Sequence, residues 1–308
     1  AYASMAIAYY YLDLFQVQKE HVEQIKYYAE KAYLIDPQLP QSLVAKAFSY
    51  MIKADYKTAV TYFEKALEYH PNSAFVINFL SDFYTNYIPD TDKYLEYALK
   101  GMQLDKSLND STANSYLYLH VSNSFLQTGF LEEALLYINK SLNYNPHNIY
   151  SMYVKAYIRF AQDKDMERTQ RSLLKIYALD TTRLDVIQEV AKSYYNLRDY
   201  PKAYHYYEKL LNERERQNFY LFVHEDIKIA WVCKELGFQE KAEGLLSEYK
   251  TYAENDHSIY QPLLMSGYFT YIEDKEQALE QLRKFSKAEG FHIWTLFLAH
   301  EPHMQFMA

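Results

Sequence analysis

The residues best suited to chemistry in this 308-residue chain gather near its end. His300 and His303 stand three residues apart, with Glu301 between them and His292 upstream. Two imidazoles at this spacing on a helix can hold a metal ion, but Pro302 interrupts the helix and the segment is not H-E-x-x-H. We therefore predict no metal site, and we interpret these histidines as solvated residues of a terminal cap.

Nucleophiles and acid–base pairs are equally sparse. The single cysteine, Cys233, lies within WVCKELG at a position expected to be buried, where a thiol is unreactive. One cysteine also excludes an internal disulfide. The remaining acidic groups are interpreted as helix starts or solvated charges: Glu132 and Glu133, Glu213 and Glu215, and His224-Glu225-Asp226. We predict no catalytic activity and no cofactor.

Composition excludes further classes of function. Six glycines leave no phosphate-binding loop of the G-x-G-x-x-G or G-x-x-x-x-G-K type. The net charge of -8 is spread evenly along the chain, so no basic face is available for nucleic acid. No apolar run is long enough to span a bilayer. The opening AYASM is not a signal peptide, which favours the cytoplasm and a fragment whose upstream part is missing.

An internal repeat indicates which helices position these residues. Ala47, Tyr50, Ala59, Phe63 and Ala66 stand at spacings of 3, 9, 4 and 3 residues. The same spacings recur in VAKSYYNLRDYPKAYHYYEKLL at Ala191, Tyr194, Ala203, Tyr207 and Leu210. Small residues let two helices approach closely, and the aromatic residues share one helix face. Each repeat is therefore predicted to be a pair of antiparallel helices.

The position of Ala59 marks each repeat, at intervals of 34 to 40 residues. The predicted markers are Ile25, Ala59, Tyr94, Ala134, Thr169, Ala203, Ala242 and Ala278. The two longest intervals imply extra residues near 109–113 and 213–218, as loops or lengthened helices. Eight repeats are expected, at about 1–37, 38–72, 73–110, 111–147, 148–182, 183–218, 219–256 and 257–290.

The period, with a small residue, an aromatic, a second small residue and a proline, resembles the tetratricopeptide repeat. Ala59-x3-Phe63-x2-Ala66-x4-Pro71 carries the pattern best, although the Trp-Leu-Gly start is largely absent. This resemblance implies an all-α, right-handed solenoid of eight helix pairs over residues 1–290. Residues 291–308 would form a short helical cap. The opening and the IWTLFLAHEPHMQFMA tail also loosely resemble the repeat arrays at the carboxy-terminal end of bacterial transcription regulators and signalling cyclases.

The solenoid implied by the resemblance places function on the face lined by the first helix of each pair. Threading the repeat onto the chain gives a candidate peptide-binding groove: Tyr9, Phe48, Asn78, Tyr116, His120, Asn123, Tyr153, Tyr157, Gln188, Lys192, Tyr195, Lys228, Trp231 and Lys234. The three lysines would form a basic end for an acidic group. The alternative interpretation is that the tyrosines only pack between repeats and the lysines are solvated.

The favoured function is a non-catalytic interaction module that binds a peptide or protein segment in this groove. The alternative is a ligand- or peptide-sensing domain of a larger regulator whose amino-terminal output domain is absent. The apolar segment Phe291 to Ala299 is expected either to fold back as the cap or to form a homodimer contact.

Overall fold

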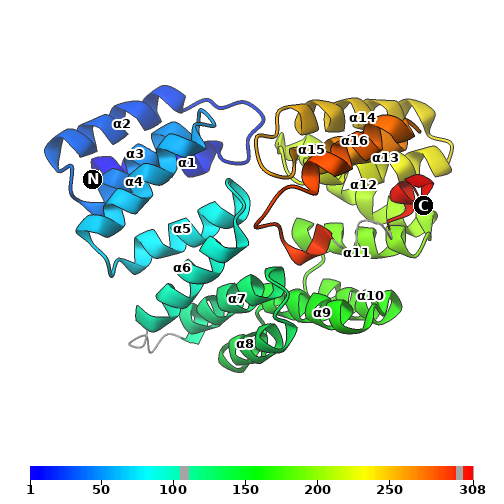
Figure 1. Cartoon of the computed structure of the whole chain (residues 1–308), viewed down its shortest axis with the longest axis horizontal. Helices are drawn as coiled ribbons and strands as arrows, with labels where there is room; N and C mark the ends of the chain where they lie inside the picture. The colour runs from blue at the N-terminus through cyan, green and yellow to red at the C-terminus, as the bar shows by residue number, and fades with distance from the viewer. Residues whose placement is uncertain (105–110, 296–300, 308) are drawn as a thin grey trace. The chain divides into compact units, whose positions relative to one another are not determined.

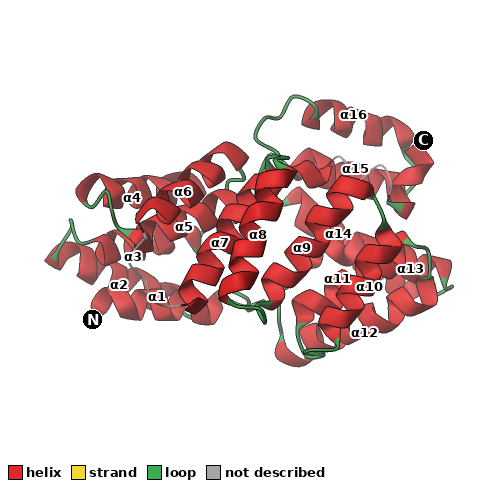
Figure 2. Cartoon of the chain, turned by 90° about the horizontal axis from the view of Figure 1, so that it is seen from below, coloured by secondary structure: helices red, strands yellow, loops and turns green. Residues whose placement is uncertain are grey.

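The computed structural model describes residues 1–104, 111–295 and 301–307, and in these ranges the regular structure is helical (Figures 1 and 2). Sixteen α-helices follow one another as eight pairs, and the two helices of each pair pack together. The prediction of an all-α array of eight helix pairs is confirmed. Among the described residues, no helix is both long and apolar enough to cross a membrane.

The eight pairs are joined by short connections. The 3-10 helix η1 (Val223–Glu225) precedes α13, and the 3-10 helix η3 (Pro302–Met307) follows the array. The helices of the pairs are α1 (Tyr2–Asp13) and α2 (Val22–Ile35), α3 (Pro40–Met51) and α4 (Tyr56–Tyr69), α5 (Ala74–Asn86) and α6 (Thr91–Leu104), α7 (Ser111–Gln127) and α8 (Leu131–Tyr144), α9 (Ile149–Asp163) and α10 (Met166–Tyr177), α11 (Leu184–Asn196) and α12 (Tyr200–Gln217), α13 (Asp226–Glu235) and α14 (Gln239–Glu254), α15 (Gln261–Tyr271) and α16 (Lys275–Phe285).

Every predicted marker is the fourth residue of the second helix of its pair, and every one is buried. Its backbone N–H donates the first hydrogen bond of that helix, as from Ala59 to the Asp55 carbonyl at 3.0 Å. Ile25, Tyr94 and Thr169 are buried almost as fully at the marker position as the five alanines, with exposures of 0, 1 and 2%. The marker therefore fixes where the second helix begins and which face it packs against the first.

The start of the second helix has its own sequence signature. In five pairs an aspartate precedes the helix and its carboxylate accepts the backbone N–H three residues on, which caps the helix. These aspartates are Asp55, Asp90, Asp165, Asp199 and Asp274. In six pairs, the residue two positions before the first residue of the second helix has a positive φ, as at Ala54 (58°) and Gly129 (86°). This single left-handed residue reverses the chain between the helices.

The predicted extra residues are accounted for in part. α12 is lengthened to 18 residues and includes the expected 213–217. In this extension the Arg214 side chain is only 10% exposed, because it pairs with buried Asp226 at 2.5 Å. Of the other insertion, residues 109 and 110 lie outside the described ranges, and α7 begins at Ser111.

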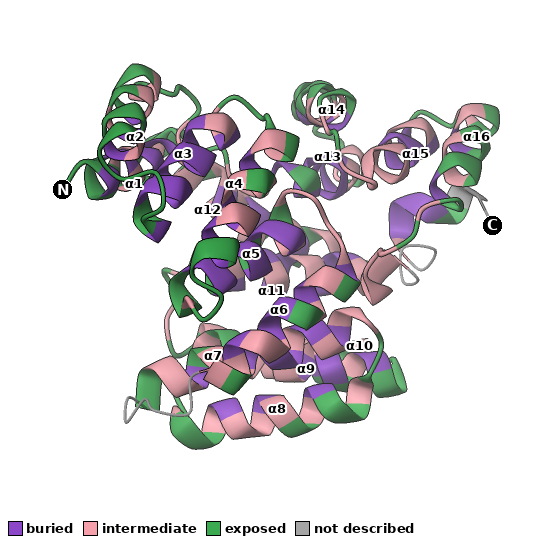
Figure 3. Ribbon diagram, turned by 60° about the vertical axis from the view of Figure 1, so that its left-hand side comes forward, coloured by how far each residue is buried: buried purple, intermediate pink, exposed green. Residues whose placement is uncertain are grey.

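Contacts divide the chain into two compact units. The first unit comprises Ala1–Asn109 with Asn218–Tyr220 and holds α1 to α6. The second unit comprises Asp110–Gln217 and Leu221–Ala308 and holds α7 to α16 with both 3-10 helices. In both, buried side chains lie where helices meet and the outer faces are exposed (Figure 3).

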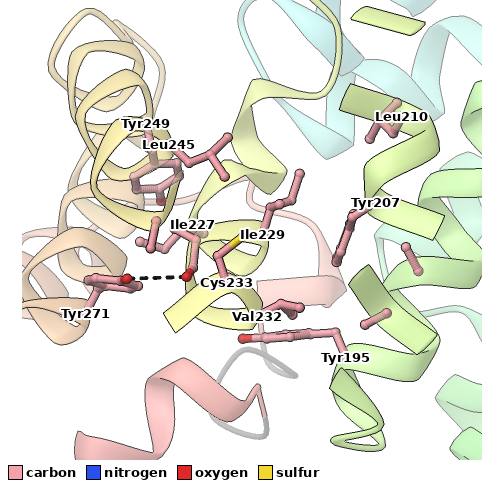
Figure 4. Packing of buried hydrophobic residues seen from close by; sticks show 14 of the residues in the cluster. Tyr195, Tyr207, Leu210, Ile227, Ile229, Val232, Cys233, Leu245, Tyr249 and Tyr271 are labelled. Atoms are coloured by element: carbon pink, nitrogen blue, oxygen red, sulfur yellow. Dashed lines mark hydrogen bonds between the residues drawn. The ribbon is translucent and has the colours of Figure 1, made fainter. Parts of the chain in front are cut away.

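Tyrosines fill much of the core of the second unit. Tyr195, Tyr207, Tyr249 and Tyr271 are each at most 7% exposed and pack with Cys233 between neighbouring pairs (Figure 4). Their hydroxyls find partners; that of Tyr271 donates to the Ala230 carbonyl at 3.3 Å. A ring with one polar tip suits such an interface, which accounts for a chain with 35 tyrosines.

Candidate functional site

The C-terminal segment, residues 291–307, lies on the first helices of the second unit. Its described parts are 291–295 and 301–307. Trp294 packs edge-on against Tyr157 of α9, with ring centroids 5.5 Å apart. Glu301 lies 3.5 Å from Lys228 of α13, and η3 packs against α15. The segment therefore contacts several pairs, and not only the last one as a simple terminal cap would.

His303 is the most closely held residue of the segment. Its Nδ1 lies 2.5 Å from the hydroxyl of Tyr195 on α11, and its backbone N–H donates to the same oxygen at 3.2 Å. The Tyr195 hydroxyl oxygen accepts the backbone N–H and shares a second hydrogen bond with Nδ1. The expectation of a solvated His303 is wrong, since only 3% of the residue is exposed.

Gly267 makes room for this contact. A Cβ built there would lie 3.6 Å from Nε2 of His303 and 3.2 Å from the Tyr249 hydroxyl. A larger residue in this part of α15 would displace one of the two rings. The segment thus occupies a slot shaped by Tyr195, Tyr249 and Gly267.

A buried charge cluster lines the same face. On α11, Lys192 lies 2.6 Å from Glu189 and places its ammonium 5.3 Å from the centre of the Tyr157 ring. The Tyr157 hydroxyl donates to Glu189. Burial alone would lower the pKa of Lys192, but the carboxylates of Glu189 and Glu225 raise it above its usual range. Lys192 therefore stays charged.

The second half of the cluster joins α13 to the C-terminal segment. Lys228 Nζ lies 2.8 Å from Glu225 and 3.5 Å from Glu301. Burial would raise the pKa of Glu225, but Lys228 and Lys192 lower it to about 2. Burial raises the pKa of Glu301, whose Oε2 has no hydrogen-bond partner. Burial also lowers the pKa of His303 to about 3, so this imidazole is neutral.

The positive charge expected at the basic end of the groove is thus balanced by acidic side chains. Glu189, Glu225 and Glu301 supply three negative charges against the two of Lys192 and Lys228. Lys234 lies 3.7 Å from Glu273 and over the rings of Trp231 and Tyr271. These lysines do not form an open cationic surface.

The other predicted residues of the second unit lie beside this face or within it. Gln188 is buried at 4% exposure, and the indole N–H of Trp231 donates to the Tyr200 hydroxyl at 3.4 Å. Tyr116 is exposed at 41% and pairs loosely with Tyr150, which also contacts Tyr153. His120 and Asn123 are partly buried on α7.

The three predicted residues of the first unit do not form one site. Tyr9 stacks on Tyr28 between α1 and α2, with ring centroids 5.7 Å apart. Phe48 belongs to the core at 2% exposure, and Asn78 is exposed on α5.

Sequence reasoning missed the carboxylates and the histidine of the cluster. Glu225 was interpreted as a helix start, and Glu301 and His303 as parts of a cap. A signal was present, because Glu189 with Lys192 and Glu225 with Lys228 have the i, i+3 spacing of helix ion pairs. No sequence spacing predicted that Glu301 would lie beside Lys228.

Cys233 is fully buried as expected, and burial raises the pKa of its thiol to about 11. Within the described ranges, no group of three histidine, cysteine or acidic residues is placed to hold a metal ion. His300 lies outside those ranges. Of the predicted homodimer segment, 296–299 also lie outside them, so the dimer stays a prediction.

No protein-family model and no curated protein matches the chain. Among solved structures, a human IFIT1 dimer with m7Gppp-AAAA is similar with a TM-score of 0.53 and 14% identity, over 86% of this chain and 67% of that one. A tetratricopeptide repeat protein from Parabacteroides merdae matches with a TM-score of 0.48 and 14% identity, over 87% and 98%. PilW, a type IV pilus biogenesis factor, matches with a TM-score of 0.49 and 16% identity, over 71% and 95%.

At these identities the likeness shows the fold alone. Together with the eight helix pairs and their constant marker, it defines the chain as an array of the tetratricopeptide-repeat type. The comparisons assign the fold and no function. The further resemblance to bacterial regulators stays a prediction.

Proposed function

We propose that this chain is a non-catalytic interaction module that binds an extended peptide segment on the first helices of its second unit. The observation that carries the proposal is the docking of the C-terminal segment on that face. Tyr157, Tyr195 and Lys228, predicted from the repeat to contact a peptide, contact Trp294, His303 and Glu301 respectively. A face that holds this segment, whose described parts include the 3-10 helix η3, offers partners for another peptide segment.

The contacts indicate the chemistry of the bound peptide. Tyr157 accepts an aromatic side chain, Lys228 a carboxylate, and Tyr195 a hydrogen-bonding ring together with its backbone N–H. The preferred partner therefore carries an aromatic residue and, further along, an acidic residue close to a histidine. A partner of this kind competes with the C-terminal segment for the same face.

The test separates the segment from the array without shortening the chain. A protease site is inserted between Lys287 and Ala288, in the connection that follows α16. After cleavage, we expect the fragment 288–308 to stay bound. A synthetic peptide of the same sequence should then displace it, which can be followed by fluorescence anisotropy of a labelled fragment.

The matched control is a peptide in which Trp294, Glu301 and His303 are replaced by alanine. It should displace the labelled fragment at least tenfold less well, because each contact contributes on the order of 1 kcal/mol. Prompt release of the fragment with no rebinding, or equal displacement by both peptides, would contradict the proposal.

A further inference from the structure

The first unit contains a cavity of about 430 Å³ that the peptide-binding proposal does not use. Its size lies in the range of about 300–1,000 Å³ typical of small-molecule sites. Its walls come from α1 and the residues that follow it, and from α3, α4 and α5. They comprise twelve residues, among them Tyr10, Tyr11, Phe48, Phe79, Asp82 and Tyr87.

Aromatic rings dominate these walls, contributing eight of the twelve residues. The rings also hold one another in place. Phe79 meets Phe48 edge-on with centroids 5.1 Å apart and stacks with Phe63 at 6.0 Å. Phe48 in turn stacks on Tyr10 at 4.2 Å. Tyr11 and Phe15, which also line the cavity, are 50% and 49% exposed, and the negative potential of an accessible ring face attracts a cation.

The lining of the cavity carries a negative charge, which suits a cation. Among its lining residues, all of them described, Asp82 is the one acidic side chain and none is basic. Asp82 is exposed on α5, at the edge of the cavity. Burial, and then the negative charge of Asp82, raise the pKa of Tyr11. The phenol is neutral at neutral pH, and the site carries one negative charge.

The polar groups of the cavity limit the kind of cation. The hydroxyls of Tyr10 and Tyr87 are 3.0 Å apart and hydrogen-bond to each other, and the Asn86 amide donates to the Asp82 carbonyl. A primary ammonium is strongly hydrated and brings three N–H donors that need acceptors. A methylated ammonium has an apolar surface and no such requirement. We propose that this cavity binds a trimethylammonium group, held by the aromatic rings and by the carboxylate of Asp82.

The first experiment compares choline with 3,3-dimethylbutan-1-ol, in which a carbon atom replaces the charged nitrogen. Both are titrated into the full chain by calorimetry. Choline should bind about tenfold more tightly, because cation–π attraction in a partly desolvated site is the difference between them. Equal affinities, or no binding of choline, would overturn the proposal.

Two variants connect the binding to this cavity. Asp82→Asn should weaken choline binding about three- to fivefold, since an exposed charge pair contributes up to ~1 kcal/mol. Phe79→Leu should weaken it about tenfold while leaving an apolar wall. Glu96→Gln, on α6 outside the cavity, removes an equal charge and should leave the affinity unchanged. Because Asp82 is exposed, that variant tests the site even where Phe79→Leu fails to fold; unchanged affinity in Asp82→Asn would refute the assignment.

The same group occurs on free small molecules and on trimethylated lysine. A Gly-Ser-Lys-Ser-Gly peptide with trimethylated lysine is compared with choline and with its unmethylated form. Tighter binding of the methylated peptide than of choline would assign the source to a protein chain. Equal affinity would assign it to a free molecule. Stronger binding of the unmethylated peptide than of the methylated one would contradict the proposal.

Discussion

The hydroxyl of Tyr195 lies 2.5 Å from Nδ1 of His303, a residue 108 positions further along the chain. This bond, with the one from the His303 backbone N–H, attaches the end of the second unit to α11, two pairs earlier than α15 and α16. In a repeat array each pair normally contacts its neighbours alone. The bond therefore adds a constraint between parts of the array that adjacent packing leaves independent.

Replacing Tyr195 by phenylalanine should loosen the C-terminal segment. Both partner groups on His303 would then be buried without a hydrogen bond, at a cost of about 1–3 kcal/mol. In the cleaved chain described above, the fragment should bind roughly 5- to 150-fold less tightly. Tyr204→Phe is the matched control, because its hydroxyl bonds to Lys241 away from the segment. Equal losses in both variants would show that Tyr195 acts only through general packing.

Attachment of the segment should weaken in mild acid. Burial lowers the pKa of His303 to about 3, whereas a detached histidine has an ordinary pKa near 6.5. The detached form takes up its proton first, so attachment is complete above about pH 6.5 and is lost as the pH falls toward 3. Glu301 acts in the opposite direction, because burial raises its pKa and its protonated form is favoured in the attached state.

The contribution of His303 is isolated by comparing the native chain with His303→Gln, since Glu301 is present in both. Fragment affinity of the native chain should fall by up to tenfold per pH unit below 6.5, beyond any fall in the variant. The measurement is fluorescence anisotropy of the cleaved chains at pH 7.5, 6.5 and 5.5. Parallel pH profiles would refute the assignment to His303.

Lys228 and Lys234 lie one and a half turns apart on α13 but should respond differently to replacement by methionine. Lys228 is buried between Glu225 and Glu301, so its loss removes the ammonium group that both carboxylates face and costs about 3–5 kcal/mol, although the Tyr207 hydroxyl still donates to Glu225. Lys234 has a side chain 36% exposed and a partner 3.7 Å away, a pair worth at most ~1 kcal/mol. Melting temperatures measured by circular dichroism should drop several degrees more for Lys228→Met. A larger drop for Lys234→Met would mean that the cluster does not stabilise this unit.

The marker position should tolerate small residues and reject large ones. Ala134 is fully buried on α8, so Ala134→Leu should cost about 1–3 kcal/mol through overpacking against α7. Thr169→Ala should cost at most about 1 kcal/mol, since one buried methyl group is lost and the Asp165 carbonyl keeps its bond from the backbone N–H of residue 169. Glu133→Leu, one residue away and exposed, controls for added apolar surface. Thermal unfolding of the three variants checks the order.

The fold could be predicted because its rules are local. The small marker, the preceding aspartate and the aromatic four residues on, as at Ala59, Asp55 and Phe63, all lie within one turn or two of the helix they specify. Even Tyr94 and Thr169, which depart from the small-residue pattern, were placed correctly by the period. The sequence of each repeat specifies its own helix pair, so an uncertain boundary in one repeat did not change the prediction for the next.

The candidate sites could be predicted only in part, because they depend on distant contacts. Threading found Tyr157, Tyr195 and Lys228, since the first helices follow from the repeat. It did not find that Glu301 and His303 would cover them, because those residues follow the last repeat and have no period. The cavity was missed for a similar reason: Asp82 and Tyr10 come from different pairs, and no spacing relates them.

The attachment of the C-terminal segment also affects how the molecule responds to force. A repeat array pulled from its end yields one pair at a time, starting with the last. Here a pull on the carboxy-terminus first loads His303 and Glu301, which are anchored on α11 and α13, before α16 can peel away. The segment thereby links the end of the array mechanically to α11 and α13.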